Sequence, residues 1–420
     1  MNGVVWATIL AIVVVVQLLV IWSIRRHRDP SLTIDCDHPI AELMPSLSGL
    51  TLGTAVAGNH VEVLENGRFF DVLIDRIAQA ERSVHIETFL WKDGRLARRL
   101  VDVLIQRARA NVSVRVLLDA QGSKGAGKEP VARMRAAGCQ VQYFHKRSLR
   151  DIGVLNDRDH RKIVVLDGRE AFVGGHCVVD DWLGDAEDGQ HFADVSVRVL
   201  GPIVHSLQGA FSENWAGETG ELFLGEDVFP ELQAQGDTRI HAVFAKPENS
   251  APTVKILHHT VICLAQKRIW IQNPYFIPEP EAIDALGAAV KRGVDVRVLM
   301  PSTGGSDNPM VQHAGHRNFQ KLMECGVRLF EYPHTLLHQK IVTIDGVWCV
   351  IGSSNFDDRS FETNDEICLS IADSTLAARL DDVFLRYVQR AQEVDLEAWK
   401  HRGLWHKLTD HAFYMLNEIL

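Results

Sequence analysis

Hydrophobic and polar positions follow two periods along the first part of this chain. Apolar residues recur every three to four positions over 70–80 and 94–110, which predicts amphipathic helices. Residues 83–91 and 112–119 are rich in apolar and β-branched side chains and predict strands. This alternation of strands and helices predicts an α/β fold whose sheet is largely buried.

The second part of the chain repeats this order. Residues 268–277, 279–292 and 294–301 predict strand, helix and strand, and both halves continue through a helix into a short strand, at 139–144 and at 326–333. The repeat interval is too long for a solenoid and has the size of a domain. The pattern therefore predicts two similar lobes, each a mixed β-sheet flanked by helices, related by a pseudo-twofold axis that brings equivalent residues to a shared seam.

The chain begins with a different pattern. About 20 consecutive apolar residues, Val4 to Ile24, match the roughly 30 Å of a bilayer core and predict a transmembrane helix, with Trp6 and Trp22 near its two ends. The basic cluster Arg25–Arg28 follows the apolar run instead of preceding it, which favours an anchor over a cleaved signal peptide. By the positive-inside rule these arginines stay in the cytoplasm, so we expect the rest of the chain on that side.

These patterns divide the chain into six segments. We expect a transmembrane anchor with its basic flank at 1–28, a juxtamembrane connector at 29–49, a first domain at 50–216, a linker at 217–250, a second domain at 251–395 and an amphipathic C-terminal helix at 396–420. In the last segment, five apolar residues are predicted to lie broadly along one helical face: Leu404, Leu408, Phe413, Leu416 and Leu420. We expect this face to pack against the domain, with contact to the bilayer as the alternative.

Composition and charge narrow the class of protein. With 420 residues, of which 46% are hydrophobic, the chain can bury a large core, which argues against disorder. A net charge of -10 argues against a surface built to bind nucleic acid, although a local basic cleft would be invisible in the sum. The seven scattered cysteines include no C-x-x-C pair, which favours reduced thiols over a disulfide frame or a zinc site.

The spacing of four histidines predicts no metal site. His258, His259, His313 and His316 have no carboxylate at a spacing typical of metal ligands, and we interpret them as helix surface. The segment GSKGAGK at 122–128 superficially resembles a phosphate-binding loop. It lacks the G-x4-G-K-[ST] order, which argues against nucleotide binding.

One phrase occurs twice in the chain. HRKIVVLDGREAFVGGHC begins at His160, and HQKIVTIDGVWCVIGSSN begins at His338. Because alternate side chains of a strand share a face, His160 projects with Lys162, and His338 projects with Lys340. A single His-x-Lys can be a coincidence of strand surface. Two copies with the same spacing indicate a shared chemical task.

Both copies continue through a tight turn and end in small residues. The turns are Asp-Gly pairs, the strongest short signal of a hairpin, and we interpret Asp167 and Asp345 as structural residues that fix these hairpins through local hydrogen bonds. Small residues end the returning strands: Gly174, Gly175, Gly352 and Ser353. Small or absent side chains there are expected to let a ligand approach backbone amides. Imidazole, ammonium and amide groups together favour a phosphate as the ligand.

The duplicated H-x-K-x4-D pattern resembles the signature of the phospholipase D superfamily, and the resemblance runs from about Leu50 to the C-terminus. Three longer stretches are similar to the bacterial cardiolipin synthase branch: IQNPYFIPEPEAIDALGAAVKRGVDVRVLMP, GVRLFEYPHTLLHQK and IGSSNFDDRSFETNDEICLSI. The resemblance implies two phospholipase D-like lobes and chemistry on a phospholipid phosphodiester.

Two histidines suit this chemistry. A phosphodiester can be split in two displacement steps when a neutral imidazole attacks phosphorus and a second, protonated imidazole gives its proton to the departing alkoxide. One copy of the phrase cannot hold both charge states, which accounts for the duplication. By resemblance, His160 is the nucleophile and His338 the general acid. Lys162, Lys340 and Asn355 are implied as phosphate ligands that offset negative charge in the transition state.

Each histidine also needs its second ring nitrogen held, because that bond fixes the tautomer. Asp194 and Glu366 stand at similar distances beyond the two phrases, and in the resembled family an acidic residue near these positions orients an active-site histidine. Which carboxylate serves which histidine stays open at this point. A charge at a strand end facing water is the alternative for Asp194.

The first lobe departs from the family pattern. Where the resembled proteins often end in G-G-x-N, this chain has Cys177, whose thiol cannot donate as an amide does. Either His176 or a backbone amide replaces that contact, or the first lobe binds phosphate less tightly; we interpret Cys177 as a buried, inert thiol. Ser354, Glu87 and Lys124 are further candidates for contact with a lipid headgroup, with ordinary surface charge as the alternative for Glu87 and Lys124.

The resemblance implies an enzyme that forms a phosphatidyl-histidine intermediate and passes the phosphatidyl group to an alcohol, without metal or cofactor. The expected reaction condenses two phosphatidylglycerol molecules to cardiolipin and glycerol, with phosphatidylethanolamine as an alternative donor. The expected partners are this phospholipid and the bilayer, with no nucleic acid, and the expected location is the bacterial inner membrane. Hydrolysis of a lipid or, less favoured, of DNA is the first alternative, and a noncatalytic membrane scaffold is the second. The residues indicate neither acyl-chain preference nor oligomeric state.

Overall fold

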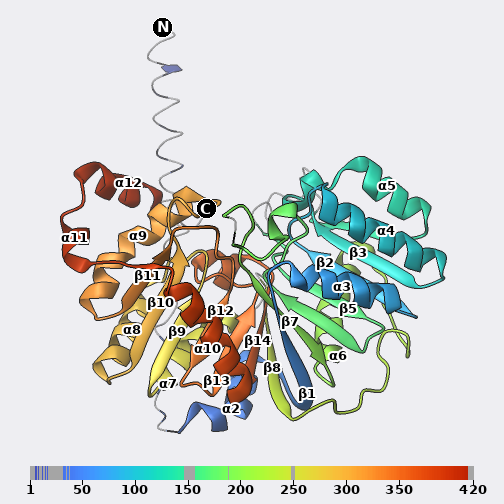
Figure 1. The fold of residues 1–420 in the computed structure, drawn as a ribbon, viewed down its shortest axis with the longest axis horizontal. Helices are drawn as coiled ribbons and strands as arrows, with labels where there is room; N and C mark the ends of the chain where they lie inside the picture. Colours follow the sequence, from blue (N-terminus) through green and yellow to red (C-terminus); the bar gives the residue numbers. More distant parts are fainter. Residues whose placement is uncertain are drawn as a thin grey trace. The chain divides into compact units, whose positions relative to one another are not determined.

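One mixed sheet runs through the unit formed by residues 36–420, and residues 1–35 form a separate unit (Figure 1). The computed structural model describes residues 5, 6, 8, 12, 15, 17, 32–34, 36, 38–145, 157–187, 189–246 and 251–414. Within these residues the sheet has 15 strands. They are β1 (Thr54–Glu65), β2 (Ser83–Thr88), β3 (Ser113–Asp119), β4 (Gln140–Phe144), β5 (Lys162–Leu166), β6 (Glu170–Gly174), β7 (Val195–Leu200), β8 (Thr238–Ala245), β9 (Arg268–Gln272), β10 (Asp295–Pro301), β11 (Arg328–Tyr332), β12 (Ile341–Ile344), β13 (Trp348–Gly352), β14 (Glu366–Ala372) and β15 (Gln392–Glu393).

The order of the strands repeats from one lobe to the other. From the edge inward, the first lobe runs β4-β3-β2-β5-β6-β7-β1, and the second runs β11-β10-β9-β12-β13-β14-β8, with β15 outside β11. In both lobes the three outermost strands of this series are parallel, and the hairpin that carries the duplicated phrase pairs antiparallel to its neighbours. The prediction of a mixed α/β fold with a duplicated domain is confirmed.

Helices cover both faces of the sheet. They are α2 (Met44–Thr51), α3 (Arg68–Gln79), α4 (Arg95–Arg109), α5 (Lys128–Ala136), α6 (Val204–Thr219), α7 (Thr253–Leu264), α8 (Pro280–Lys291), α9 (Pro309–Glu324), α10 (Ser374–Val388), α11 (Leu396–Lys400) and α12 (Leu404–Tyr414). Short helical turns lie at Ile40–Glu42, Gly122–Ala126, Asp180–Trp182 and Arg359–Thr363. Most predicted elements agree with these bounds to within a few residues, because their hydrophobic periods were long and regular.

The position of strand β5 explains why the duplicated phrase has consecutive apolar residues instead of alternating apolar and polar ones. Its side chains at Val164 and Leu166 join the core beneath α3 and α4, whereas Ile163 and Val165 join the core that contains α6 and α10. A strand covered by helices on both faces needs apolar residues at every position, not only at every second one. The first copy of the duplicated phrase thus lies in the interior of the sheet.

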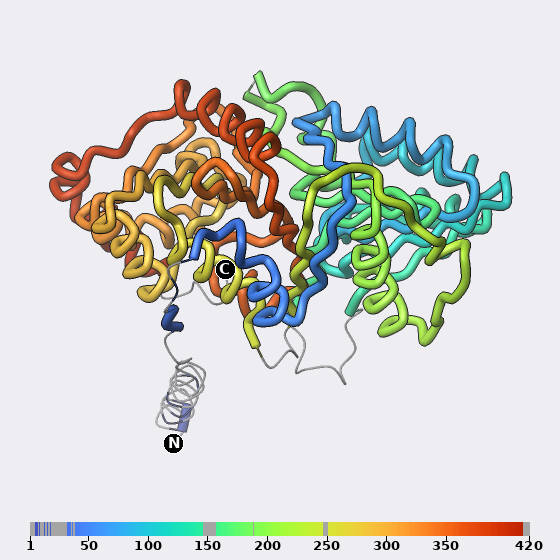
Figure 2. The backbone as a smooth tube through the Cα atoms, turned by 90° about the horizontal axis from the view of Figure 1, so that it is seen from below, coloured from blue at the N-terminus to red at the C-terminus, as the bar shows by residue number. Residues whose placement is uncertain are grey.

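The two lobes meet along β1 and β8, which pair antiparallel (Figure 2). Strand β8 also pairs with β14 over seven residue pairs, and β1 pairs with β7 over six. Thr238–Ala245 had been predicted as part of a linker at 217–250, and that prediction is wrong for these residues. Their alternating pattern is short and follows a Gly-rich, acidic stretch, so the local signal for a strand is weak.

The signature aspartates bond to distant backbone amides. Asp167 accepts hydrogen bonds from the backbone N–H groups of Glu81, Arg82 and Ser83, at the start of β2. Asp345 likewise accepts hydrogen bonds from the backbone N–H groups of residues 266–268, at the start of β9. The prediction of local hydrogen bonds within the hairpin is therefore corrected: each aspartate ties its hairpin to the neighbouring strand.

Replacing Asp167 by alanine should lower the free energy of unfolding by about 1–3 kcal/mol, because three amides lose a charged acceptor. Asp227→Ala is the matched control, since its carboxylate pairs only with the exposed side chain of Arg82 and should cost less than about 0.5 kcal/mol. Urea denaturation of the two variants measures the difference. Equal stability of both variants would contradict the structural role of Asp167.

No helix among the described residues combines the length and the apolar character needed to cross a bilayer. The predicted anchor at Val4 to Ile24 and its basic flank lie mostly outside those residues. The transmembrane prediction is therefore carried by the sequence pattern alone.

The C-terminal helix does not present a single apolar face. Leu404 and Leu408 on α12 are exposed, whereas Phe413 packs against the small cluster that contains Ile277 and Val311. At 100° per residue, positions 404 and 413 lie on opposite sides of a helix. The predicted common face is corrected for these residues, and Leu416 and Leu420 lie outside the described part of the chain.

Candidate active site

Both copies of the duplicated phrase converge at the seam between the lobes. His160 and Lys162 lie at the start of β5, and His338 and Lys340 lie just before β12. Two isolated bridges hold them in place, because Asp159 pairs with Asp365 and Ala193 pairs with Leu337. All four side chains of the two His/Lys pairs are buried, with exposed fractions of 4–8%.

Each of the two histidines bonds to a carboxylate from the other lobe. The His160 Nδ1 atom lies 2.8 Å from Glu366 Oε1, and the His338 Nδ1 atom lies 2.8 Å from Asp194 Oδ2. Both carboxylates are completely buried. This arrangement settles which carboxylate contacts which histidine, and it contradicts the alternative of a water-facing charge at Asp194.

The remaining contacts of the carboxylates determine the tautomer of both rings. Asp194 accepts N–H groups from the indole of Trp182 and the backbone of Val195, both at 2.8 Å, and Glu366 accepts the hydroxyl of Ser353. An ionised carboxylate can only accept, so each histidine donates its Nδ1–H. The Nε2 atoms of His160 and His338 therefore carry lone pairs.

The environment keeps both imidazoles neutral. Burial, reinforced by Lys162 and Lys340 and opposed by Glu366, lowers the pKa of His160 to about 4. Burial and the same two lysines hold the pKa of His338 well below its usual range. The charges of both lysines thus act on both rings, which indicates that the four groups share one site. Burial would raise the pKa of Glu366, but the neighbouring His160 and Lys162 outweigh it and lower that pKa.

The two lysines are not equivalent. Lys340 Nζ lies 2.9 Å from His338 Nε2 and 2.8 Å from the His338 carbonyl. Lys162 Nζ donates to the His160 carbonyl at 2.6 Å and stands 5.4 Å from the ring centre of Phe89. Burial lowers the pKa of Lys340 to about 7, with Asp194 opposing the shift and Lys162 adding to it.

The small residues after the hairpins make room for protein groups. A Cβ atom on Gly175 would lie 2.5 Å from Asp194 Oδ1, one on Gly174 would lie 2.1 Å from Ser196 Oγ, and one on Gly352 would lie 2.1 Å from the Ile367 carbonyl. These close approaches account for the glycines, because they admit the neighbouring strand and the carboxylate that contacts His338. The expected contact of a ligand with the backbone at these positions stays a prediction.

The ends of the two phrases differ between the lobes. Asn355 is buried, its backbone N–H donates to Ser360 Oγ at 3.0 Å, and its Oδ1 atom has no hydrogen-bond partner among the described residues. Ser354 donates to the Asn355 carbonyl at 3.0 Å. Cys177, at the position equivalent to Asn355, is buried, and burial raises the pKa of its thiol. These contacts favour an inert thiol at Cys177 and a side-chain amide at Asn355 that is available to a ligand.

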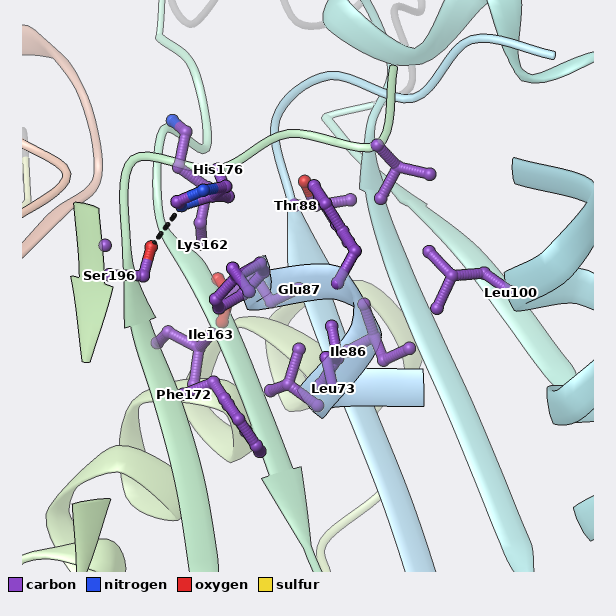
Figure 3. A pocket seen from close by; sticks show the side chains of 15 residues that line it. Leu73, Ile86, Glu87, Thr88, Leu100, Lys162, Ile163, Phe172, His176 and Ser196 are labelled. Carbon is purple, nitrogen blue, oxygen red and sulfur yellow. Dashed lines mark hydrogen bonds between the residues drawn. The ribbon is translucent and has the colours of Figure 1, made fainter. Parts of the chain in front are cut away.

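His176 has protein partners at both ring nitrogens. Nδ1 lies 2.7 Å from Ser196 Oγ (Figure 3). Nε2 lies 3.0 Å from the Asn66 carbonyl, and the ring stacks on Phe69. Figure 3 also places His176 and Lys162 at the top of a mostly apolar cavity in the first lobe. The expected headgroup contact of His176 thus has no free ring nitrogen to support it.

Glu87 lies in a buried polar cluster beneath His160. Its side chain accepts from Asn214 Nδ2 at 2.7 Å, and the same amide donates to Asp365 at 3.0 Å. Burial raises the pKa of Glu87, and Arg161, which is fully buried, opposes that shift. Glu87 is therefore not a surface charge, and that alternative is wrong, whereas its expected contact with a headgroup stays a prediction. The cluster supports the backbone on either side of His160.

Two aromatic residues at the site were not predicted from the sequence. Trp182 packs edge-on against His338 with ring centres 5.1 Å apart, and Phe89 packs edge-on against His160 at the same distance. Each ring shields one histidine from solvent, which strengthens the effect of the neighbouring charges. The sequence offers a weak signal only for Phe89, which lies near the end of the strand predicted at 83–91.

Comparisons with known proteins identify relatives of the whole unit. The family described as "Cardiolipin synthase, PLD-like domain" matches residues 73–178 and 259–388. Cardiolipin synthase 2 from Bacillus anthracis is 32% identical over 365 residues, which cover 85% of this chain and 70% of the relative. Cardiolipin synthase A from Pseudomonas syringae pv. syringae is 32% identical over 381 residues, which cover 90% and 78%.

Two solved structures share the fold. A phosphatidylserine synthase from Haemophilus influenzae aligns with a TM-score of 0.67 at 15% identity, over 90% of this chain and 99% of that chain. A polyphosphate kinase from Porphyromonas gingivalis aligns with a TM-score of 0.52 at 13% identity, over 89% of this chain and 53% of that chain. At these identities the likeness extends to the fold alone.

Proposed function

Because the chain belongs to the cardiolipin synthase family with its phospholipase D-like domain, we propose that it condenses two phosphatidylglycerol molecules to cardiolipin and glycerol through a phosphatidyl-histidine intermediate. The chain is a phosphatidyltransferase of the phospholipase D superfamily. The observation that carries the finer proposal is the crossed pair of His–carboxylate contacts, one for the nucleophile and one for the acid–base residue of a double displacement.

In the first step, His160 Nε2 attacks the phosphorus of one phosphatidylglycerol. A P–N bond forms, and the P–O bond to the glycerol headgroup breaks. The departing oxygen takes a proton from the protonated form of His338, which the adjacent phosphate anion favours. The products of this step are free glycerol and a phosphatidyl group on His160.

In the second step, the neutral His338 removes a proton from the glycerol hydroxyl of a second phosphatidylglycerol. The oxygen attacks phosphorus, the P–N bond breaks, and His160 leaves as a neutral imidazole. Lys162, Lys340 and the side-chain amide of Asn355 balance the charge on the non-bridging oxygens in both steps. A low local dielectric around these buried groups increases their effect.

The contacts at the two Nε2 atoms favour His160 as the nucleophile. His338 Nε2 lies within 2.9 Å of Lys340 Nζ, an ammonium group that can replenish its proton. No donor to His160 Nε2 is recorded among the described residues, so its lone pair is free to attack. This difference supports the assignment that the family resemblance implied.

We also propose that the two lobes are related by a pseudo-twofold axis at the seam. The matching strand orders and the reciprocal bridges at Asp159 and Ala193 support this. A single-pass anchor at 1–28, with the catalytic unit on the cytoplasmic side of the inner membrane, would keep the site beside its lipid substrate. The boundaries of the two domains remain a prediction as well.

The product of labelled phosphatidylglycerol tests the proposed function. Purified full-length protein in lipid vesicles should yield labelled cardiolipin and stoichiometric free glycerol. Phosphatidic acid alone would indicate hydrolysis instead. Inertness toward lipid together with nicking of DNA would reverse the substrate class, and full rescue of a synthase-deficient cell by a double His160→Ala, His338→Ala variant would favour a scaffold.

The pKa of Lys340, lowered to about 7, predicts the alkaline limit of activity. Lys340 carries its charge below this pH and loses it above, so kcat/KM should fall as the pH rises through about 7, because kcat/KM reports the free enzyme. Lys340→Arg keeps the charge at every accessible pH and should shift this limb upward, at the cost of a lower plateau. An unchanged alkaline limb in the arginine variant would contradict the assignment.

A further inference from the structure

Three histidines and one aspartate meet where α12 packs along α9, outside the site described above (Figure 1). His313 and His316 lie on α9, and His406 and Asp410 lie on α12. Their potential ligand atoms all lie within 4.8 Å of one another. The sequence had suggested a helix surface without a carboxylate for His313 and His316, and the structure supplies that carboxylate from a helix almost 100 residues away.

The separations suit a small ion. Asp410 Oδ1 lies 2.8 Å from His313 Nδ1 and 3.7 Å from His316 Nδ1, and Asp410 Oδ2 lies 3.1 Å from His406 Nδ1. A tetrahedral ion about 2.0 Å from each ligand sets neighbouring ligands roughly 3.3 Å apart. The observed distances bracket that value, so small side-chain shifts would complete the geometry.

His316 provides an independent indication. Its side chain is 3% exposed, and its Nδ1 atom is buried without a hydrogen-bond partner among the described residues. Its other nitrogen, Nε2, lies 3.1 Å from Glu331 Oε1. A histidine bound to a metal usually donates its second ring N–H to a carboxylate, which orients the ring. His316 has both features, a ring nitrogen that could bind the metal and a second ring nitrogen beside a carboxylate.

The charges around the cluster are compatible with a divalent cation. Asp410 is fully buried, and Arg402 donates to its Oδ2 atom at 3.2 and 3.4 Å. Oδ1 faces His313 and His316, the two proposed ligands on α9. Within the part of the chain that the structure describes, Arg402 is the cation bonded to Asp410, and the carboxylates of Asp410 and Glu331 offset it together with part of the ionic charge.

We propose that His313, His316, His406 and Asp410 bind one divalent transition-metal ion, zinc in the first instance. Imidazole nitrogens with a single carboxylate favour zinc and its neighbours over magnesium or calcium. Four protein ligands leave no open position, so the ion is structural and fastens α12 to α9. The proposal is independent of the proposed function, because none of these residues contacts the catalytic pairs.

Zinc binding by the full-length chain, prepared without a histidine tag and stripped with a chelator, tests the proposal. Equilibrium dialysis followed by elemental analysis should find one zinc per chain. His406→Gln removes a partly exposed ligand and should weaken zinc binding by at least roughly 100-fold. The matched control His401→Gln alters an exposed histidine just before α12 and should bind zinc as the wild type does.

A second variant separates ligation from folding. Glu331→Gln leaves all four ligands and should weaken binding by about 10- to 100-fold while one zinc still binds at saturation. Saturating cobalt in place of zinc should give the intense visible absorption of a tetrahedral site in the wild type, the control and Glu331→Gln, but not in His406→Gln. Absence of zinc from the wild type at micromolar free metal would overturn the proposal. Equal zinc affinity of the wild type, His406→Gln and Glu331→Gln would do so too.

Discussion

Replacing His160 or His338 by alanine is expected to lower the rate of phosphatidyl transfer by at least roughly 10⁴-fold, because each ring performs a covalent or proton-transfer step that no neighbour can take over. Cardiolipin formation from labelled phosphatidylglycerol measures the loss. His205→Ala is the matched control: this half-buried histidine on α6 bonds only to the Pro230 carbonyl among its described contacts, and its loss should leave the rate nearly unchanged.

A substrate with a good leaving group distinguishes the roles of the two histidines. A phosphatidyl ester of nitrophenol needs no general acid, so His338→Ala should still release nitrophenol once per chain and accumulate a phosphatidyl group on the peptide that contains His160. His160→Ala should release none and carry no adduct. An adduct on the His338 peptide of the His160→Ala variant would reverse the two assignments.

The second large effect is expected from the carboxylates that cross the seam. Glu366→Gln and Asp194→Asn should each lower kcat by about 10²–10⁴-fold, with a smaller change in KM, because an amide no longer holds the Nδ1–H tautomer or stabilises the imidazolium form. Steady-state rates with labelled lipid measure this split. Glu366→Asp, which retains the charge, should recover part of the rate.

A purely structural role would give a different result. Glu170→Gln is the matched control, since Glu170 is also a buried carboxylate but bonds to Arg76 and Arg198 away from the histidines. It should lower thermal stability while keeping kcat at permissive temperature. If Glu366→Gln lost stability in the same way and kept its kcat, the orienting role would be wrong.

The sequence predicted the two histidines and the two carboxylates of the site but not which carboxylate contacts which histidine. The repeat placed His160 and His338 in equivalent positions, and similar spacing together with the family resemblance pointed to Asp194 and Glu366. Glu366 is 206 residues from His160, and Asp194 is 144 residues from His338. Pairing at that separation depends on which strands adjoin at the seam, and hydrophobic periodicity carries no information on strand order between lobes.

The same limit explains the less accurate predictions. Strand β8 lies beside a Gly-rich, acidic stretch, so its eight residues gave too short a pattern to separate them from a linker. The cluster around Asp410 forms only because α12 packs along α9, and no spacing within either helix indicates it. These features depend on contacts between elements. The type and bounds of most helices and strands, in contrast, follow from local periodicity.

The continuous strand order β14-β8-β1-β7 across the seam has a consequence for how the enzyme admits lipid. A hinge opening between the lobes would break the backbone hydrogen bonds that join β8 to β1. We therefore expect the distance between the two imidazoles to be preorganised and to stay fixed during turnover. Substrate access must depend on side chains and loops at the rim, so the rate of product release should respond to mutations there and be insensitive to the relative motion of domains.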